Sequence, residues 1–460
     1  MSGLSFEQGL NPEQAEAVRS TEGPLLILAG AGSGKTRVIT FRIAHLIQDL
    51  GVDPWAIYAV TFTNKAAEQM RARLDSLLGG MGYGGLWIST FHSSCVRILR
   101  NEIHHLGYEP HFVIYDDKEQ KQLIKEVLKE LDLSEKVVDP RMVAGKFDQL
   151  KNQGYLPDDE WEMDFGFGEE RLRQIYKRYQ ERLKQMNALD FGDLLVQTTR
   201  LFEQHDEVRA QYARQFEYVL VDEYQDTNKV QYKLIQQLTR EHQNVCVVGD
   251  DDQSIYKWRG ADITNIFNFE RDYPGTKVIK LEQNYRSTQN ILKVANAVIS
   301  HNTARKGKQL WSAIEGGALV THHHAEDEHA EARFIVKSAR DRVHTEGKGW
   351  RDVAIFYRTN AQSRVLEEEL LKHRIPYNIL GGQKFYDRKE VKDALCYLRL
   401  LINPVDDVAL LRIINTPTRG IGPGTVEKLQ DSAAQQRISL LEATRRACTD
   451  GTLGTGPTKK

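Results

Sequence analysis

The hydrophobic pattern at the start of the chain alternates between strand-like and helix-like segments. Residues 12–19 have a helical pattern, residues 25–28 form an uninterrupted apolar run, and a glycine-rich turn follows. The next apolar positions recur at helical spacing: Ile39, Ile43, Leu46, Ile47 and Leu50. Residues 57–62 and 86–91 again predict strands, with a helical pattern between them. This alternation predicts a parallel α/β sheet.

The pattern changes after residue 104 and returns later in the chain. Residues 104–189 are charged and helical in spacing, which predicts an inserted helical subdomain. Strands are then predicted at 218–221, 245–249, 278–281, 318–322 and 353–357. A second α/β unit is therefore expected to begin near Glu282, and the chain after the glycines at 381–382 is again expected to be helical, as at 391–401 and 408–414.

Composition narrows the class of protein. With 460 residues, 40% hydrophobic and 27% charged, the chain predicts two to four globular domains. It has no membrane-length apolar run and its first residues lack the pattern of a signal peptide, so a cytoplasmic location is expected. The net charge of −2 means that any nucleic-acid site must be local. The four cysteines form no CxxC pair, which disfavours zinc, iron–sulfur and disulfide frameworks.

A phosphate-binding loop is the clearest chemical signal. The residues assigned to it are Ala29, Gly30, Ala31, Gly32, Ser33, Gly34, Lys35 and Thr36, with Arg37 next to them. Its glycines let backbone N–H groups turn towards phosphate oxygens at a helix N-terminus, while Lys35 reaches the terminal phosphates and Thr36 ligates Mg²⁺. A glycine-rich turn without a ligand is the alternative, and the flanking strand and helix disfavour it.

Two carboxylates end a later apolar strand. Asp222 and Glu223 follow residues 218–221, and such a strand tip lies beside the phosphate loop in a parallel sheet. Asp222 is expected to hold Mg²⁺ and Glu223 to deprotonate the attacking water. Acidic residues that merely cap a strand are the alternative for either one alone; together with the loop, the pair predicts ATP hydrolysis.

Six segments together resemble superfamily one DNA helicases of the UvrD/Rep/PcrA type. They are LNPEQA at 10–15, AVTFTNKAA at 59–67, ISTFHS at 88–93, VDEYQDTN at 221–228, VGDDDQSIYKWRGA at 248–261 and QNYRS at 283–287. The combination of the DEYQD and GDxxQSIYxWRGA segments is highly specific. The resemblance covers most of the chain.

The resemblance implies a fold and a division into domains. It implies an α/β fold with a RecA-like motor domain that has a helical insertion, followed by a partial second RecA-like domain and a partial second helical insertion. The expected ranges are 1–104 and 191–281 for the first motor domain, 105–190 for its insertion, 282–380 for the second motor domain and 381–460 for the second insertion.

The resemblance also implies further nucleotide contacts. By position, Gln14 would read the adenine edge, Tyr285 would stack on adenine, Gln253 would sense the γ-phosphate, and Arg286 would act as an arginine finger. Without the family, Gln14 is simply a helix-surface amide and Arg286 an exposed charge.

A motor on single-stranded DNA needs contacts that tolerate any sequence, and aromatic stacking provides them. The aromatic candidates are Phe62, Phe191, Tyr256 and Trp258. The polar candidates are Thr61, Asn64, His92 and Arg259, together with Arg358 and Asn360. Taken alone, Phe62 and Phe191 fit a core position better, whereas Trp258 between two basic residues does not.

A histidine group raises a metal hypothesis. His322, His323 and His324 lie near His329, but the three follow predicted strand residues, where neighbouring side chains alternate between faces. This alternation disfavours a metal site.

The resulting functional hypothesis is an ATP- and Mg²⁺-dependent motor on single-stranded DNA and its junctions with duplex. The resemblance implies 3′-to-5′ helicase activity in DNA repair or replication. Alternatives are a nucleotide-gated single-strand-binding fragment without unwinding activity and an RNA-directed helicase, while no carboxylate cluster supports a fused nuclease.

Two later segments of the family, of the TVHxxKGLE and YVAxTRA kinds, are not found in these 460 residues. We therefore expect a chain that binds ATP but is defective in coupled unwinding. An unpaired apolar sheet edge is expected to promote its association.

Overall fold

The computed structural model describes residues 9–79, 84–161, 168–302, 305–380 and 388–450. The chain divides into two compact units, one of Met1–Gly317 with Asp393–Lys460 and one of Ala318–Lys392. None of the described helices has both the length and the apolar character needed to cross a lipid bilayer.

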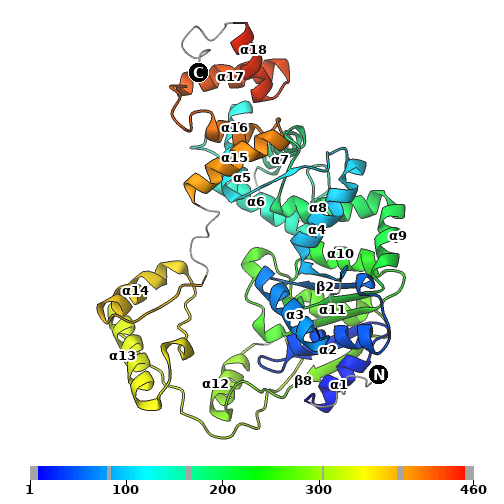
Figure 1. The fold of residues 1–460 in the computed structure, drawn as a ribbon, viewed down its shortest axis with the longest axis vertical. Helices are drawn as coiled ribbons and strands as arrows, with labels where there is room; N and C mark the ends of the chain where they lie inside the picture. The colour runs from blue at the N-terminus through cyan, green and yellow to red at the C-terminus, as the bar shows by residue number, and fades with distance from the viewer. Residues whose placement is uncertain (1–8, 80–83, 162–167, 303–304, 381–387, 451–460) are drawn as a thin grey trace. The chain divides into compact units, whose positions relative to one another are not determined.

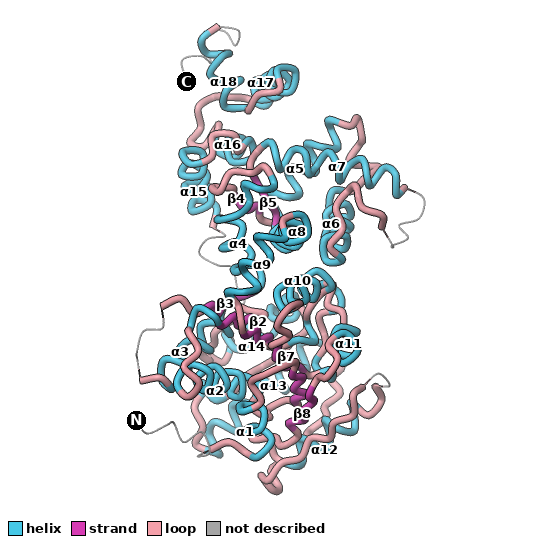
Figure 2. Tube along the Cα trace, turned by 90° about the vertical axis from the view of Figure 1, so that its right-hand side faces the viewer, coloured by secondary structure: helices cyan, strands magenta, loops and turns pink. Residues whose placement is uncertain are grey.

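The first unit contains a six-stranded sheet in the order β3-β2-β6-β7-β1-β8, with every pair parallel. The strands are β1 (Leu25–Ala29), β2 (Ile57–Thr61), β3 (Trp87–Thr90), β6 (Tyr218–Val221), β7 (Val245–Gly249) and β8 (Lys277–Leu281). Figure 2 shows them in magenta. All six strands predicted in this part of the sequence are confirmed, with ends that shift by at most two residues.

Helices cover both faces of this sheet (Figure 1). Leu25 and Ile27 of β1 join one buried cluster, whereas Leu26 and Leu28 join the other. The first cluster includes residues of α1 (Pro12–Arg19), α2 (Lys35–Gln48) and α3 (Asn64–Leu77). The second includes residues of α4 (Phe91–Glu102), α8 (Phe191–Gln204), α9 (Asp206–Gln215), α10 (Lys229–Thr239) and α11 (Thr264–Asp272). Burial on both faces explains why the central strands β1, β6 and β7 are continuous apolar runs, whereas the edge strand β8 carries the exposed Lys277 and Lys280.

A third buried cluster organises the segment between α4 and α8. Its elements are η2 (Ile103–Leu106), β4 (Val113–Tyr115), α5 (Asp117–Glu130), α6 (Pro140–Gln153), α7 (Glu169–Gln185) and β5 (Ala188–Asp190). The segment is mainly helical, as its spacing predicts. Its parallel β4–β5 pair was not predicted, because strands of three residues leave little periodic signal.

The described residues of the second unit contain no strand, so the strands predicted at 318–322 and 353–357 are wrong. Leu319 is 80% exposed and Phe356 is 93% exposed, and neither segment has a strand to pair with. The helices are α13 (Glu328–Glu346) and α14 (Ser363–Lys372), with η6 (Trp350–Asp352) and η7 (Asn360–Gln362). Residues 322–324 are not in a strand, so the alternation of strand side chains no longer argues against a metal site there. The His323 ring stacks on the Phe334 ring, with 3.8 Å between their centroids.

The later helices of the first unit pack next to the helical insertion. They are α15 (Lys389–Ile402), α16 (Asp407–Ile413), α17 (Pro423–Gln436) and α18 (Leu440–Thr449), and α12 (Gln289–Ile299) lies earlier in the chain. The Tyr115 hydroxyl donates to Asp406 at 2.7 Å, and Asn403 Nδ2 donates to the Met186 carbonyl at 2.7 Å. The glycines expected to begin this region lie in 381–387, outside the described residues.

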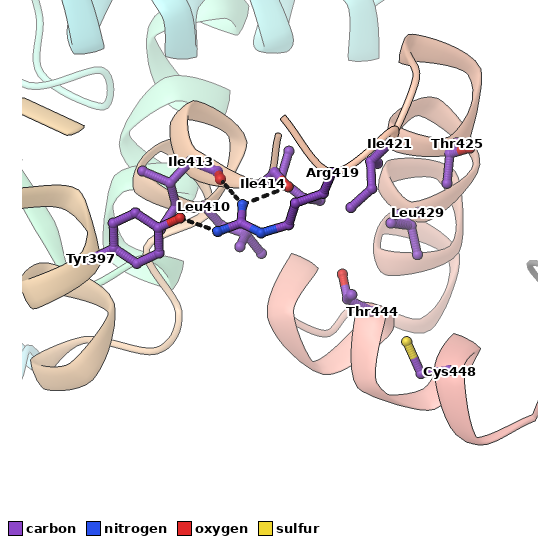
Figure 3. Close-up of a pocket in the computed structure, with 10 residues that line it drawn as sticks. All are labelled: Tyr397, Leu410, Ile413, Ile414, Arg419, Ile421, Thr425, Leu429, Thr444 and Cys448. Carbon is purple, nitrogen blue, oxygen red and sulfur yellow. Dashed lines mark hydrogen bonds between the residues drawn. The ribbon is translucent and has the colours of Figure 1, made fainter. Parts of the chain in front are cut away.

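A pocket of about 300 Å³ lies among α15 to α18 (Figure 3). Apolar side chains such as Leu410 and Leu429 line it. The guanidinium of Arg419 donates to the carbonyls of Ile413 and Ile414 at 2.6 and 3.1 Å, and also to the Tyr397 hydroxyl. These bonds hold Arg419 at the end of α16.

Candidate functional site

The phosphate loop lies between β1 and α2, as expected. Gly34 caps α2 with φ 91° and Gly32 has φ 69°, conformations that glycine adopts readily. The Ser33 hydroxyl donates to the Gly30 carbonyl at 2.8 Å and so closes the loop on itself. The loop therefore presents backbone N–H groups and the N-terminus of α2 at the carboxyl edge of the sheet.

Lys35 is the cation of this loop. Its Nζ lies 3.3 Å from Glu223 Oε2 and 3.9 Å from Asp250 Oδ2, so carboxylates from the ends of β6 and β7 approach it. The Nζ atom is buried and has no hydrogen-bond partner among the described residues. A buried ammonium with unused donors fits the terminal phosphates of a nucleotide.

The metal-binding residues predicted from the sequence also meet here. Thr36 Oγ1 lies 3.5 Å from Asp222 Oδ2. Burial raises the pKa of Asp222 to about 7, with Glu223 adding to the increase and Lys35 opposing it. Burial and Glu223 likewise raise the pKa of Asp226 to about 7. A hydroxyl and carboxylates are hard oxygen donors of the kind Mg²⁺ prefers, and a cation bound beside these carboxylates would favour their charged forms.

Glu223 adopts a conformation that is uncommon for a residue other than glycine. Its φ is 50°, in the left-handed region. Gln225 Nε2 donates to Glu223 Oε2 at 2.9 Å, and Gln225 Oε1 accepts from the Asp250 backbone N–H at 2.9 Å. Gln225 thus links the ends of β6 and β7 and orients the candidate base. Sequence reasoning did not assign Gln225, although the DEYQD segment contains it.

Gln14 lies against the phosphate loop. It is 2% exposed, its Nε2 donates to the Ser33 carbonyl at 2.8 Å, and its Oε1 accepts from the Asn11 N–H at 3.1 Å. The alternative of a surface amide is therefore wrong. Arg37, one residue beyond the loop, is exposed, and its guanidinium lies 5.4 Å from the centre of the Phe41 ring.

The QNYRS segment also contacts the loop. The Tyr285 N–H donates to the Gly32 carbonyl at 3.0 Å, and Asn284 Nδ2 donates to the Ala31 carbonyl at 2.6 Å. A Cβ on Gly32 would lie 2.9 Å from the Cβ of Arg286. Tyr285 and Arg286 are exposed beside the loop, and the contact made by Asn284 was missed by sequence reasoning.

Gln253 lies in an acidic segment that follows β7. Its Nε2 donates to Asp250. The carboxylates of Asp250, Asp251 and Asp252 are close enough to share a cation, and the buried ammonium of Lys308 already pairs with all three. Sequence reasoning did not find Lys308, because its partners are remote in the sequence.

Aromatic candidates for DNA stacking form one group near the end of β2. The Phe62 and Tyr256 ring centroids are 5.2 Å apart, and those of Tyr256 and Trp258 are 6.4 Å apart. The Arg259 guanidinium lies 4.7 Å from the Trp258 ring centre and 5.2 Å from that of Tyr256. Trp258 is 63% exposed, so its ring is accessible to a base.

A second aromatic pair lies at the starts of α4 and α8. The Phe191 and His92 rings meet edge to face, 6.1 Å apart at 77°. Phe191 is 51% exposed, so the core alternative for it is wrong. Burial lowers the pKa of His92, which keeps the imidazole neutral at pH 7.

The polar candidates divide between the two units. Thr61 is buried with an Oγ1 that has no hydrogen-bond partner among the described residues, and Asn64 is exposed at the start of α3. Arg358 and Asn360 belong to the second unit, where the Arg358 backbone N–H donates to Gln362 Oε1 at 2.9 Å.

This site defines a class of protein. Residues 10–274 match the family model described as the UvrD/REP helicase N-terminal domain, and residues 279–449 match the UvrD-like helicase C-terminal domain. The chain belongs to the UvrD/REP helicase family, which confirms the resemblance and its α/β motor fold.

Individual relatives cover nearly the whole chain. The ATP-dependent DNA helicase PcrA of Staphylococcus epidermidis is 52% identical over 436 residues, which is 95% of this chain and 60% of that protein. The protein of the same name from Bacillus subtilis is 50% identical over 436 residues, 95% of this chain and 59% of the relative. The chain thus spans about 60% of the length of the curated relatives it matches.

Proposed function

We propose that this chain is the ATP-hydrolysing part of a Mg²⁺-dependent motor on single-stranded DNA. The observation that carries the proposal is the buried Nζ of Lys35, which lies between the phosphate loop and the carboxylates of Glu223 and Asp250 and has no hydrogen-bond partner among the described residues. The names of the relatives, ATP-dependent DNA helicase PcrA, support the same assignment.

In this proposal the chain's residues divide the work of hydrolysis. Mg²⁺, held by Thr36 and Asp222, would offset the negative charge of the phosphates. Lys35 binds the terminal phosphates. Glu223, oriented by Gln225, accepts the proton from the water that attacks the γ-phosphorus, while the bond to the β–γ bridging oxygen breaks and ADP and phosphate leave.

The family's further contacts complete the proposed nucleotide site. Gln14 and Tyr285 would hold the adenine, Gln253 would sense the γ-phosphate and Arg286 would stabilise charge in the transition state. The proximity of residues 284–286 to Gly32 and Ala31 supports this part of the proposal.

Single-stranded DNA would lie along the two aromatic groups, with Phe62, Tyr256 and Trp258 in one and His92 and Phe191 in the other. We further propose 3′-to-5′ translocation, junctions between single strand and duplex as substrates, and a role in DNA repair or replication. The domain ranges 1–104 with 191–281, 105–190, 282–380 and 381–460 belong to the same proposal.

The test is ATP hydrolysis by the 460-residue chain with and without single-stranded DNA, compared with Glu223→Gln. The exposed Glu68 of α3 provides a matched control, Glu68→Gln. We expect DNA to stimulate the wild type and the control, and Glu223→Gln to lose turnover while it still binds ATP. Turnover that survives in Glu223→Gln, or a wild type that DNA does not stimulate, would refute the proposal.

Polarity and unwinding need a separate measurement. Duplexes with a 3′ or a 5′ single-stranded tail are to be compared, with RNA as a competitor for binding. Separation of the 3′-tailed duplex alone supports the helicase. Turnover without separation of either duplex favours the nucleotide-gated single-strand-binding alternative, and preferential competition by RNA favours an RNA-directed enzyme.

A further inference from the structure

Two consecutive residues at the end of α6, Lys151 and Asn152, contact both elements that carry the aromatic groups. Lys151 faces the start of α8, where Phe191 is the first residue. Asn152 faces the loop that contains Trp258. No role in DNA binding or hydrolysis is assigned to α6 by its sequence.

Lys151 is 1% exposed and lies between two carboxylates. Its Nζ is 2.6 Å from Asp190 Oδ2 and 2.7 Å from Asp193 Oδ1. Asp190 and Asp193 form the capping box of α8. A Cβ on Gly192 would lie 2.7 Å from Lys151 Cδ, so α8 begins in direct contact with this lysine. Lys151 therefore fixes the end of α6 to the start of α8, where Phe191 is the first residue.

Asn152 makes one hydrogen bond on each side of its amide. Its Nδ2 donates to the Arg259 carbonyl at 3.2 Å, and its Oδ1 accepts from Asn228 Nδ2 at 2.8 Å. Gly260 has φ 86°, and a Cβ there would lie 2.5 Å from Asn152 Nδ2. The backbone that follows Trp258 is thus in close contact with Asn152.

The other partner, Asn228, ends the segment that carries the catalytic carboxylates. Asn228 caps α10, and the preceding Thr227 accepts through its carbonyl from the Asp262 N–H at 2.9 Å and from Asn265 Nδ2 at 3.1 Å. One backbone hydrogen bond from Asp262, one side-chain hydrogen bond from Asn265 of α11 and the Asn152 bridge therefore join the end of the carboxylate segment to the Trp258 loop and the helix that follows it.

We propose that Asn152 is a positioning residue that holds the Trp258 loop against the carboxylate segment, so that a bound single strand stimulates hydrolysis. This inference rests on the proposed function. Lys151, the residue before Asn152, holds the start of α8 through its two ion pairs. Phe191 therefore stays at a fixed distance from Asn152, and in this proposal the two aromatic groups bind one strand together. If the Asn152 bridge couples DNA binding to ATP hydrolysis, its removal must change how strongly DNA stimulates hydrolysis, and this change is measurable.

The test compares Asn152→Ala with Gln153→Ala, a neighbour of similar burial whose side chain makes no hydrogen bond to any other described residue. In Asn152→Ala we expect the DNA concentration for half-maximal stimulation to rise about tenfold, as removal of hydrogen bonds of this kind predicts. The KM for ATP without DNA should stay within about twofold of wild type. Gln153→Ala should match wild type in both measurements.

A second variant separates positioning from general loss of structure. Asn152→Asp keeps an acceptor for Asn228 but replaces the donor to the Arg259 carbonyl, so it should show the same loss of DNA stimulation with an unchanged melting temperature. In the double variant with Trp258→Ala, Asn152→Ala should add little to the loss of DNA affinity, because it acts through Trp258.

Additive losses in the double variant, or normal stimulation in both Asn152 variants, would overturn the inference. A wild type that DNA does not stimulate would instead overturn the proposed function, so the two failures are distinguishable.

Discussion

Removal of the Lys151 ammonium should destabilise the helical insertion strongly, and Lys151→Met tests this at nearly constant side-chain volume. The ammonium is 1% exposed and pairs with two buried carboxylates. Asp190 also accepts from the Tyr179 hydroxyl at 2.8 Å, and Asp193 accepts from Gln180 Nε2 at 2.9 Å. Neutral donors alone cannot offset two buried charges, and breaking a buried ion pair typically costs about 3–5 kcal/mol.

The loss of unfolding free energy caused by Lys151→Met should be larger at high pH than at low pH. Burial raises the pKa of Asp193 to about 6, with Asp190 adding to the increase and Lys151 opposing it. For Asp190, burial is also the largest single influence, but the charge and hydrogen bond of Lys151, together with the hydrogen bonds from the Asp193 N–H and the Tyr179 hydroxyl, lower the pKa. Without Lys151 both pKa values rise, so the native variant binds more protons than the unfolded chain. Its stability therefore falls as pH rises above the unfolded value of about 3.9.

The assay is urea unfolding followed by circular dichroism at pH 5 and pH 8, with Lys118→Met, an exposed lysine at the start of α5, as the control. We expect the deficit of Lys151→Met to be larger at pH 8 than at pH 5. Asp193→Asn in the same chain should restore part of it, because one unpaired charge is removed. A loss below about 1 kcal/mol, or one independent of pH, would refute this reasoning, because it would show that the two buried carboxylates do not need the Lys151 ammonium to stay charged.

Four further outcomes follow from the nucleotide and DNA sites. Lys35→Ala should abolish ATP turnover but keep the far-ultraviolet circular dichroism of the wild type, since Lys35 does not stabilise the core; a folded variant that still turns over ATP would contradict its role. Trp258→Ala should weaken single-strand binding by about 1–3 kcal/mol in a fluorescence titration without changing the KM for ATP in the absence of DNA, and equal binding would place the strand elsewhere. The Mg²⁺ concentration for half-maximal hydrolysis should rise as pH falls below about 7, because a protonated Asp222 does not hold the cation; a requirement unchanged down to pH 5.5 would count against it. Gly32→Ala should lower ATP affinity and stability more than Gly51→Ala, which has the same φ of 69° but open space around it, and equal losses would mean that strain alone matters.

The first sheet could be predicted from the sequence because its strands are short, mostly apolar and bounded by turn residues. The strands predicted at 318–322 and 353–357 failed although their sequences have similar local character. An apolar segment becomes a strand only when it pairs with a neighbour, and no described residue of the second unit provides one. Local pattern therefore identified the segments that have a neighbouring strand and misjudged those without one.

The residues of the candidate site also divide into those that local sequence predicts and those that only contacts between remote segments reveal. Lys35, Asp222 and Glu223 could be found because each lies at a fixed offset from a strand end. Lys308 could not, since its burial depends on Asp250, Asp251 and Asp252, which are remote in the sequence. Lys151 and Asn152 look like ordinary residues at the end of a charged helix, and only the contacts with α8 and the Trp258 loop reveal their surroundings.

The topology of one sheet accounts for the proximity of the two proposed sites. Strands β6, β7 and β1 are neighbours and parallel, so their carboxyl ends bring Glu223, Asp250 and Lys35 together. The chain that leaves β7 at Asp250 continues through Gln253 to Tyr256, whose ring lies next to Phe62 at the end of β2. A single loop therefore begins beside the proposed nucleotide site and ends at the proposed DNA site. Asn152 joins the far end of this loop to the carboxylate segment through two hydrogen bonds, and this short path is the one through which the proposed coupling of the two sites would act.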